Sequence, residues 1–277
     1  MQLTVESKCG GKRLKGIPVE MSAPPLVSIV TVVFNGAAEL ESTILSVLGQ
    51  TCSNLEYIII DGGSTDGTLD VIGKYDDIIG YWVSEKDKGI YDAMNKGLEA
   101  ACGKWIYYLN CGDSFSYSDV VEKASGALAD TKAPIVAGFV LVNSTDSNIS
   151  RLPLPAVADT SARSLFKRRF CHQALFVLRE AYLAHHGFDL NFPTFADFDV
   201  CWKIISTCGE PEYIDLDIAN FDLTGVSSDS RKSLTLYIEA ERIFHKHDEG
   251  RSRVGYWIGF ARSFAYRYKR ALVGRFR

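Results

Sequence analysis

The sequence lacks the cysteine patterns that hold zinc or staple small domains. Its seven cysteines are odd in number and scattered, with no C-x-x-C pair, which argues against a zinc knuckle and a disulfide framework. Residues 1–20 contain no apolar core of the kind a signal peptide needs. No uninterrupted apolar run approaches the roughly 20 residues of a membrane span. The reducing cytoplasm is therefore the expected location.

Two common nucleotide-binding motifs are also missing. No G-x-G-x-x-G follows the first predicted strand, which argues against a dinucleotide-dependent oxidoreductase. Residues 97–104 fail as a P-loop, because five residues separate the two glycines and Trp105 stands where Ser or Thr is required. A sugar-nucleotide pyrophosphorylase would open with a Gly-rich loop carrying Arg and Lys, and residues 31–36 carry neither.

The remaining composition is that of an ordinary globular protein. Of the 277 residues, 47% are hydrophobic and 23% charged, which is enough for a sizeable core in one or two domains. There is no internal repeat or low-complexity segment. Residues 1–24 are polar, basic and glycine-containing, so we expect a flexible extension there.

From Pro25 onward, apolar runs and helical patterns alternate. The β-branched run 27–34 is typical of a strand buried on both faces, and the apolar positions between 40 and 48 follow helical spacing. Strands over 55–60, 80–83 and 105–109 and helices near 67–75 and 89–101 continue the pattern. Such alternation predicts an α/β fold with a mostly parallel sheet, flanked by helices.

Polar clusters follow each predicted strand of this sheet. Ligands of open α/β sheets bind at the carboxyl ends of the strands, so these clusters predict one crevice. They comprise Thr31 and Asn35, residues 61–66, residues 85–89 and residues 110–113. Asp113 is placed to hold a divalent cation against a phosphate, although Asn and Gly before Asp are also ordinary turn residues. Asp66 is expected to cap a helix rather than bind a ligand.

The C-terminal segment has a composition of its own. Residues 251–277 contain eight basic residues and no acid, interleaved with aromatic residues such as Trp257 and Phe264. A basic, aromatic-rich amphipathic helix suits an anionic membrane surface. A helix packed on the domain with a solvated basic edge is the alternative, and nucleic acid is not the expected partner.

Several of these segments together resemble family 2 glycosyltransferases. The similarity is carried, in order, by residues 27–35, 46–51, 61–68, 84–97, 171–173 and 195–200. It spans about residues 26–228 and is closest to the branch that builds bacterial O-antigen and similar surface polysaccharides. The resemblance implies the GT-A fold and transfer with inversion of the sugar's anomeric configuration.

The resemblance also implies a role for each matching residue. Phe34 and Asp61 would flank the nucleotide base, while Asp87 and Asn95 would line the ribose and diphosphate. Asp113 would bind the metal, Mg²⁺ or Mn²⁺, and His172 would lie near the diphosphate or the acceptor. Asp197 would be the catalytic base. The expected donor-binding set is Thr31, Phe34, Asn35, Asp61, Asp87, Lys88, Asn95 and His172.

Two positions depart from the family pattern. Gly62 stands where the family often has a second acid, and Asn110 replaces the first acid of the metal motif, which predicts weak metal binding. Asp199 is the alternative base. One of the two acids, Asp197 and Asp199, is expected to lie at a helix N-terminus only because a negative charge is favourable there. A structural role for His172 is as compatible with the sequence as a role in the site.

These inferences define an inverting, metal-dependent glycosyltransferase. We expect residues 25–229 to form the GT-A domain and residues 230–277 a helical, basic, membrane-associating tail. The donor would be a nucleotide sugar, most commonly UDP-linked in this family. The acceptor would be a polyprenyl-diphosphate-linked glycan at the cytoplasmic face of a bacterial membrane. The alternatives are an inactive sugar-nucleotide-binding protein and a nucleotidyltransferase, whose product would be pyrophosphate.

Overall fold

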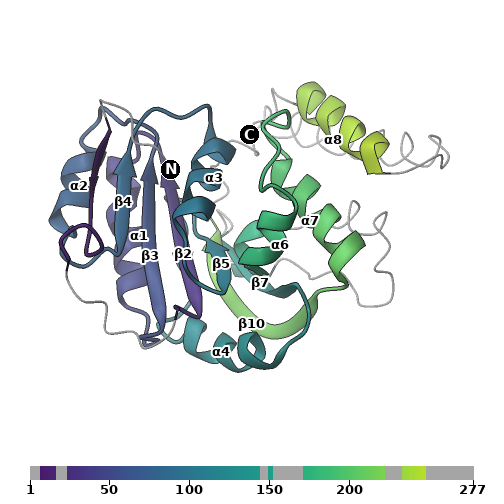
Figure 1. Cartoon of the computed structure of the whole chain (residues 1–277), viewed down its shortest axis with the longest axis horizontal. Helices are drawn as coiled ribbons and strands as arrows, with labels where there is room; N and C mark the ends of the chain where they lie inside the picture. The colour runs from purple at the N-terminus through teal and green to yellow at the C-terminus, as the bar shows by residue number, and fades with distance from the viewer. Residues whose placement is uncertain (1–6, 17–23, 144–148, 152–170, 222–232, 248–277) are drawn as a thin grey trace, which may run out of the picture. The chain divides into compact units, whose positions relative to one another are not determined.

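The computed structural model describes residues 7–16, 24–143, 149–151, 171–221 and 233–247 (Figure 1). The chain divides into a first unit ending at Leu223 and a second beginning at Thr224. The described part of the second unit is helix α8 (Ser233–His247). The sequence predictions about residues 251–277 lie outside the described residues.

The first half of the chain forms the parallel part of a single sheet. Strands β2 (Val27–Val33), β3 (Leu55–Asp61), β4 (Tyr81–Ser84) and β5 (Trp105–Tyr108) stand in the order β4-β3-β2-β5 and pair in parallel. Helices α1 (Ala37–Leu48), α2 (Thr68–Lys74) and α3 (Ile90–Ala100) connect them. The predicted alternation of strands and helices is confirmed over this region.

Helices cover this part of the sheet on both faces (Figure 1). Every residue of β2 is buried, which explains its continuous apolar sequence. Two adjacent tyrosines of β5 lie on opposite faces of the sheet. Tyr107 belongs to the core cluster that includes Leu40 and Ile44 of α1, whereas the Tyr108 hydroxyl donates to the Met94 carbonyl of α3 at 3.0 Å.

The second half of the chain extends the sheet with mixed strand directions. Beyond β5 the order is β9-β7-β10-β6, with β8 paired to β7. Strand β9 is antiparallel to both of its neighbours, β5 and β7. Strands β7 and β10 pair in parallel. The elements are β6 (Ser114–Phe115), α4 (Val120–Asp130), β7 (Ile135–Asn143), β8 (Ile149–Arg151), the 3₁₀ helix η1 (His172–Ala174), β9 (Leu175–Leu178), α6 (Arg179–Ala184), α7 (Ala196–Cys208) and β10 (Glu212–Phe221).

At the N-terminus the structure differs from the expected flexible extension. Strand β1 (Lys8–Gly10) pairs antiparallel with β4 at the edge of the sheet. The backbone N–H of Gly11 donates to Asp76 Oδ1 at 2.7 Å, and Lys15 forms an ion pair with Asp76 at 2.5 Å. The polar composition of this segment reflects its partners, which are charged side chains and backbone groups.

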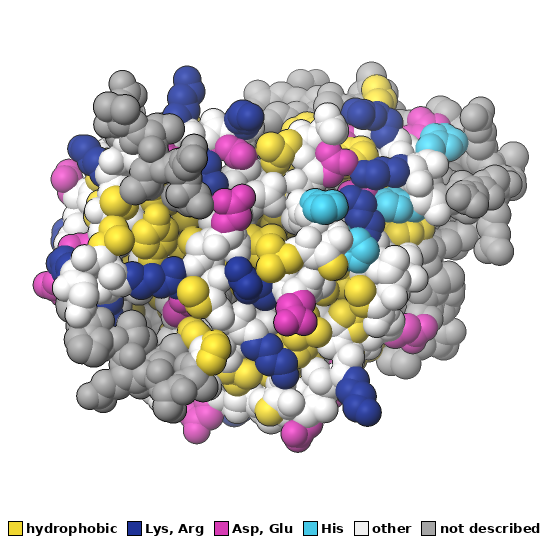
Figure 2. Space-filling model, viewed as in Figure 1, with side chains coloured by type: hydrophobic (Ala, Val, Ile, Leu, Met, Phe, Trp, Pro, Cys, Tyr) yellow, Lys and Arg dark blue, Asp and Glu magenta, His cyan; other side chains and the backbone are white. Residues whose placement is uncertain are grey.

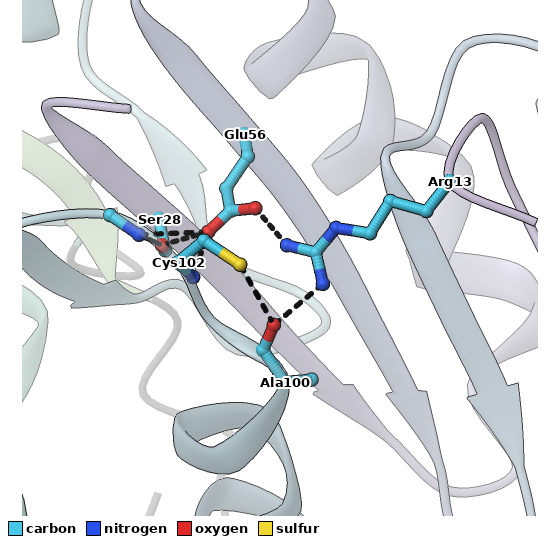
Figure 3. Close-up of polar contacts among 6 residues, drawn as sticks. Arg13, Ser28, Glu56, Ala100 and Cys102 are labelled. Carbon is cyan, nitrogen blue, oxygen red and sulfur yellow. Dashed lines mark hydrogen bonds and ion pairs between the residues drawn. The ribbon is translucent and has the colours of Figure 1, made fainter. Parts of the chain in front are cut away.

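A buried carboxylate fixes the end of this N-terminal segment (Figure 3). Glu56 of β3 forms an ion pair with Arg13 and accepts from the Ser28 hydroxyl. It also accepts from the backbone N–H of Gly103 at 3.0 Å. Arg13 donates in addition to the Ala100 carbonyl at 2.6 Å. A single carboxylate thus joins the N-terminal segment, β2, β3 and the turn that follows α3.

The surface of the sheet-containing unit carries charges of both signs. Figure 2 shows Lys and Arg side chains interspersed with Asp and Glu, with small apolar patches between them. Across the described ranges, no helix combines the length and the apolar character that membrane crossing requires.

We predict that Arg13→Ala destabilises the fold. Removing one member of a buried ion pair costs about 3–5 kcal/mol, but Arg13 is 27% exposed and Glu56 keeps its other donors. We therefore expect the free energy of unfolding to fall by about 1–3 kcal/mol in urea titrations. The control is Lys123→Ala, because the Lys123–Asp119 pair is exposed and such pairs contribute about 0–1 kcal/mol. Equal losses in the two variants would contradict this account.

Candidate functional site

The polar clusters predicted at the strand ends lie at neighbouring positions of the sheet. Val33 at the end of β2 is in register with Asp61 of β3, and Asp61 is in register with Ser84 of β4. Strand β5, which leads into residues 110–113, pairs with the other side of β2. Four consecutive strands therefore deliver their carboxyl-terminal segments to one edge of the sheet.

The segment after β5 forms a tight turn that α1 holds in place. Gly112 has φ +95°, a left-handed conformation that favours glycine, and the Asp113 N–H donates to the Asn110 carbonyl at 3.0 Å. The Thr43 hydroxyl accepts from the Gly112 N–H at 3.1 Å and donates to the Asp113 carbonyl at 2.8 Å. These bonds fix the backbone of the turn from which the side chains of Asn110 and Asp113 project.

A second segment, residues 171–173, orients the Asp113 carboxylate. The Gln173 amide donates to Asp113 Oδ2 at 3.0 Å, and Gln173 Oε1 lies 2.9 Å from the Cys171 sulfur. Burial raises the pKa of the Cys171 thiol to about 12, so Cys171 remains a thiol and donates at neutral pH. The Tyr107 hydroxyl donates to the Gln173 carbonyl at 2.6 Å. Asp113 itself is only 5% exposed.

Asp197 lies in the first turn of α7 and is held by three donors. The Phe198 N–H lies 2.9 Å and the Tyr91 hydroxyl 2.8 Å from Asp197 Oδ1. His172 Nδ1 lies 3.2 Å from Oδ2. The Asp197 side chain is 18% exposed, so its carboxylate is fixed in orientation yet open to a small part of the surface.

His172 joins Asp197 to the turn after β5. Its Nε2 lies 3.0 Å from Asn110 Nδ2, while its Nδ1 faces Asp197. The sequence left open whether His172 is structural or part of the site. Its position between Asn110 and Asp197 gives it contact with both acidic segments of the candidate site.

Asp199, the alternative base, has a different environment. Its side chain is fully buried, and Lys203 one helical turn later forms an ion pair with it at 2.6 Å. A buried, paired carboxylate at the start of α7 has the structural role expected for an N-terminal helix acid. The geometry therefore favours Asp197 over Asp199 as the acid available to a substrate.

Phe34 and Asp87 form a second part of the site, over the end of β3. Phe34 is 65% exposed, an unusual placement for a large apolar ring. A Cβ atom at Gly62 would lie 2.4 Å from Asp87 Oδ2 and 3.3 Å from Phe34 Cδ2. Only glycine at position 62 leaves room for the Asp87 carboxylate there. Partial burial raises the pKa of Asp87.

Several other predicted site residues shape this edge through bonds within the chain. Asp61 is fully buried. Its Oδ2 accepts from the Ser64 N–H at 3.0 Å and the Ser84 hydroxyl at 2.5 Å. Asn35 Oδ1 accepts from the Thr65 N–H at 2.9 Å. Asp66 precedes Gly67, the N-cap residue of α2, and accepts from the first N–H groups of α1 and α2 at 3.0 and 3.1 Å.

Thr31 and Asn95, both expected in the donor-binding set, are hydrogen-bonded to other parts of the chain. Thr31 is fully buried within β2, and the Tyr57 hydroxyl donates to it at 3.0 Å. Both groups of the Asn95 amide bond to the backbone of Phe188, at 2.8 and 2.9 Å. Asn95 therefore fastens α3 to the chain before α7. Lys88 is exposed, and its backbone N–H donates to Asp92 at 3.0 Å.

The turn after β5 offers oxygen ligands that suit a hard divalent cation. Asn110 Oδ1 is buried and has no hydrogen-bond partner within the described residues. A buried orphan oxygen three residues from Asp113 is compatible with a cation site that phosphate oxygens and water complete. No group of three or more His, Cys, Asp and Glu side chains in the described ranges could hold a metal.

Sequence analysis assigned no role to Tyr91 or Gln173, although both belong to the site. Tyr91 contacts Asp197 across 106 positions of the chain, and Gln173 contacts Asp113 across 60. Both lie in segments that carried the family resemblance. Their polar side chains beside apolar runs were the available signal, but spacing along the chain could not reveal their partners.

Comparison with known proteins gives a consistent result. The family model described as Glycosyl transferase family 2 matches residues 28–187. A PGL/p-HBAD biosynthesis glycosyltransferase of Mycobacterium tuberculosis is 33% identical over 181 residues, covering 64% of this chain and 68% of that protein. An uncharacterized glycosyltransferase of the same organism is 35% identical over 213 residues, covering 75% and 79%.

Solved structures with the same fold include two complexes with nucleotide sugars. Staphylococcus aureus TarS (residues 1–349, in complex with UDP-GlcNAc) aligns with a TM-score of 0.64 and 12% identity, covering 81% of this chain and 68% of that one. The mannosyltransferase PcManGT of Pyrobaculum calidifontis, in complex with GDP-Man and Mn²⁺, aligns with a TM-score of 0.63 and 16% identity, covering 91% and 74%.

Proposed function

The chain belongs to glycosyltransferase family 2 and has the GT-A fold, and on this basis we propose that it transfers a sugar from a nucleotide-diphosphate donor to a glycan acceptor with inversion. The observation that carries the proposal is the connection of Asp197 to the turn of Asp113 through His172, with contacts of 3.2 and 3.0 Å. It brings a candidate base and a candidate diphosphate site into one hydrogen-bonded unit.

The donor nucleotide would lie over the ends of β2, β3 and β4. The exposed ring of Phe34 offers a surface on which a base can stack. Asp87 is an acceptor for ribose hydroxyls beside it, and Lys88 is a cation near the N-terminus of α3 for the diphosphate. We propose that Asp61 acts through the turn it fixes. UDP is the proposed nucleotide, in line with the UDP-GlcNAc complex of TarS.

Asp197 is the proposed catalytic base. The acceptor hydroxyl attacks the anomeric carbon, the bond from that carbon to the diphosphate oxygen breaks, and the hydroxyl proton moves to Asp197. A positioned carboxylate contributes about 10²–10⁴-fold to such a step. With one carboxylate base and no protein nucleophile, a single displacement inverts the configuration.

Asp113 and Asn110 Oδ1 are the proposed protein ligands of a Mg²⁺ or Mn²⁺ ion. When bound, the cation would stabilise the negative charge that develops on the leaving diphosphate. Gln173 holds the Asp113 carboxylate in place by its hydrogen bond to Oδ2. The weak ligand set is compatible with a cation that arrives with the donor.

For the acceptor, we propose a lipid-linked glycan at the inner face of a bacterial membrane, as in surface polysaccharide synthesis. The support comes from the sequence of residues 251–277, with its eight cations and interleaved aromatic residues. Such a segment would bring the enzyme to the surface where a polyprenyl-diphosphate acceptor resides.

The first test of this function uses Asp197→Asn. The amide keeps the size of the side chain but cannot take the proton, so transfer should fall at least about 100-fold with little change in donor binding. The assay is release of nucleoside diphosphate from a panel of nucleotide sugars, with and without acceptor. Asp199→Asn is the comparison variant. Loss of transfer in Asp199→Asn, with transfer retained in Asp197→Asn, would contradict the assignment. Release of pyrophosphate would indicate a nucleotidyltransferase, and binding without turnover a sugar-nucleotide-binding protein.

The metal proposal predicts a matched pair of effects. Asp113→Ala should weaken metal-dependent donor binding, and EDTA should weaken it equally in the unaltered protein, because both remove the cation from the diphosphate. Isothermal titration with UDP in Mn²⁺, in Mg²⁺ and in EDTA measures this. Undiminished transfer in excess EDTA would exclude a metal role and leave Lys88 as the candidate counter-charge.

The membrane proposal predicts salt-sensitive binding to anionic vesicles. Each cation near such a surface contributes up to about 1 kcal/mol, less with distance and salt. Full-length protein should therefore co-sediment with vesicles of phosphatidylglycerol at low salt and less at high salt. A chain ending at residue 250 should bind weakly and keep its activity on a short water-soluble acceptor. Equal binding by both proteins would contradict the proposal.

A further inference from the structure

The hydrogen bonds around Asp197 leave one position on its carboxylate for a proton. An ionised carboxylate has about four acceptor positions, two on each oxygen. Oδ1 lies against the Phe198 N–H and the Tyr91 hydroxyl, whose single proton is shared between Asp197 and the Thr194 carbonyl at 2.8 and 2.7 Å. On Oδ2, His172 Nδ1 uses one, and no other partner lies within the described residues. Oδ2 is therefore the atom that can accept a substrate proton.

The bond to Oδ2 requires that His172 carry its ring proton on Nδ1. A carboxylate oxygen only accepts hydrogen bonds, so the ring nitrogen facing it must donate. In a neutral imidazole the other nitrogen, Nε2, is then an acceptor. The group opposite Nε2 is Asn110 Nδ2, at 3.0 Å, and an amide N–H₂ group is a donor. The two contacts are consistent with one tautomer of His172.

On these contacts we propose that Asn110 and His172 are positioning residues. Asn110 fixes His172 in the tautomer with the proton on Nδ1, and His172 holds Asp197 with its open Oδ2 position directed to the acceptor hydroxyl. The inference rests on the proposed function, in which Asp197 is the base. In this role Asn110 donates a hydrogen bond to Nε2, which an ionised aspartate could not do.

The departure at position 110 thereby acquires a chemical reason. An aspartate there would supply a second charged oxygen to a metal, but it would offer Nε2 only acceptors. The ring would then need a proton on Nε2, so only a charged imidazolium could still donate to Asp197, and the neutral tautomer with its proton on Nδ1 would no longer be selected. A metal-ligand role alone predicts that Asn110→Asp keeps or improves transfer. The positioning role predicts that it lowers transfer.

The ring tautomer can be measured directly in metal-free, full-length protein without substrate. Two-bond ¹H–¹⁵N correlation spectra at pH 8 distinguish protonated from unprotonated ring nitrogens. The His172 signals among the five histidines are identified by their loss in His172→Asn. We expect a protonated Nδ1 and a bare Nε2 in the unaltered protein, and a protonated Nε2 in Asn110→Asp. A proton on Nε2 in the unaltered protein, or no change in Asn110→Asp, would overturn the inference.

Two substitutions of His172 separate its two contacts. Asparagine places an N–H₂ group near the position of Nδ1 and can still donate to Asp197, whereas glutamine reaches toward Asn110 and loses that donor. We expect kcat to fall about 10-fold in His172→Asn and about 100-fold in His172→Gln, the range typical of groups that orient a reacting residue. The KM for the donor should change less than threefold in both.

His186→Asn is the matched control, because His186 is exposed and has φ +62°, a conformation that asparagine adopts readily. It should leave kcat unchanged. Equal losses of kcat in the two His172 variants would overturn the positioning role. If Asp197→Asn itself retains transfer while the spectra show the expected tautomer, the proposed base is wrong and the hydrogen-bond assignment stands. The two failures are therefore distinguishable.

Discussion

The site depends on the hydrogen bonds of three consecutive residues, Cys171 to Gln173. Gln173 fixes the Asp113 carboxylate, and His172 contacts both Asn110 and Asp197. The turn of Asp113 follows β5 in the first half of the chain, whereas the helix of Asp197 lies in the second half. Because the acids are largely buried, each needs a donor from a neighbouring segment. The 171–173 segment supplies those donors, since it enters antiparallel strand β9 beside β5.

Much of the parallel half could be predicted from the sequence. Strands buried on both faces produce continuous apolar runs, and short loops place glycine and acids at their ends, so β2 and β3 were evident from composition alone. The structure of residues 7–16 could not be predicted, because their strand is stabilised by Asp76 and Glu56 rather than by apolar burial. Among the candidate site residues, Asp113 and Asp197 could be proposed from the sequence. The sequence could not show that the Asn95 amide is hydrogen-bonded to the backbone of Phe188, because the two residues are 93 positions apart in the chain.

The glycine at position 62 illustrates how a departure from a family pattern is accommodated. The Asp87 carboxylate occupies the space that a side chain at position 62 would need. The acid near Phe34 is Asp87, which the loop after β4 delivers. The family resemblance implies a role for Asp87 as well, so at this position only the second acid beside Asp61 is missing.

The short strands at the two ends of the main sheet have a consequence for the behaviour of the protein at high concentration. An edge strand with free backbone groups is a template onto which another chain can add, and long flat edges promote aggregation. Here the ends of the strand order are β1, with three residues, and β6, with two. Strand β1 covers β4 over only Trp82 to Ser84, and Gly11, Lys12 and Arg13 follow it. Each end strand thus offers only a few backbone groups of its own for pairing with another chain.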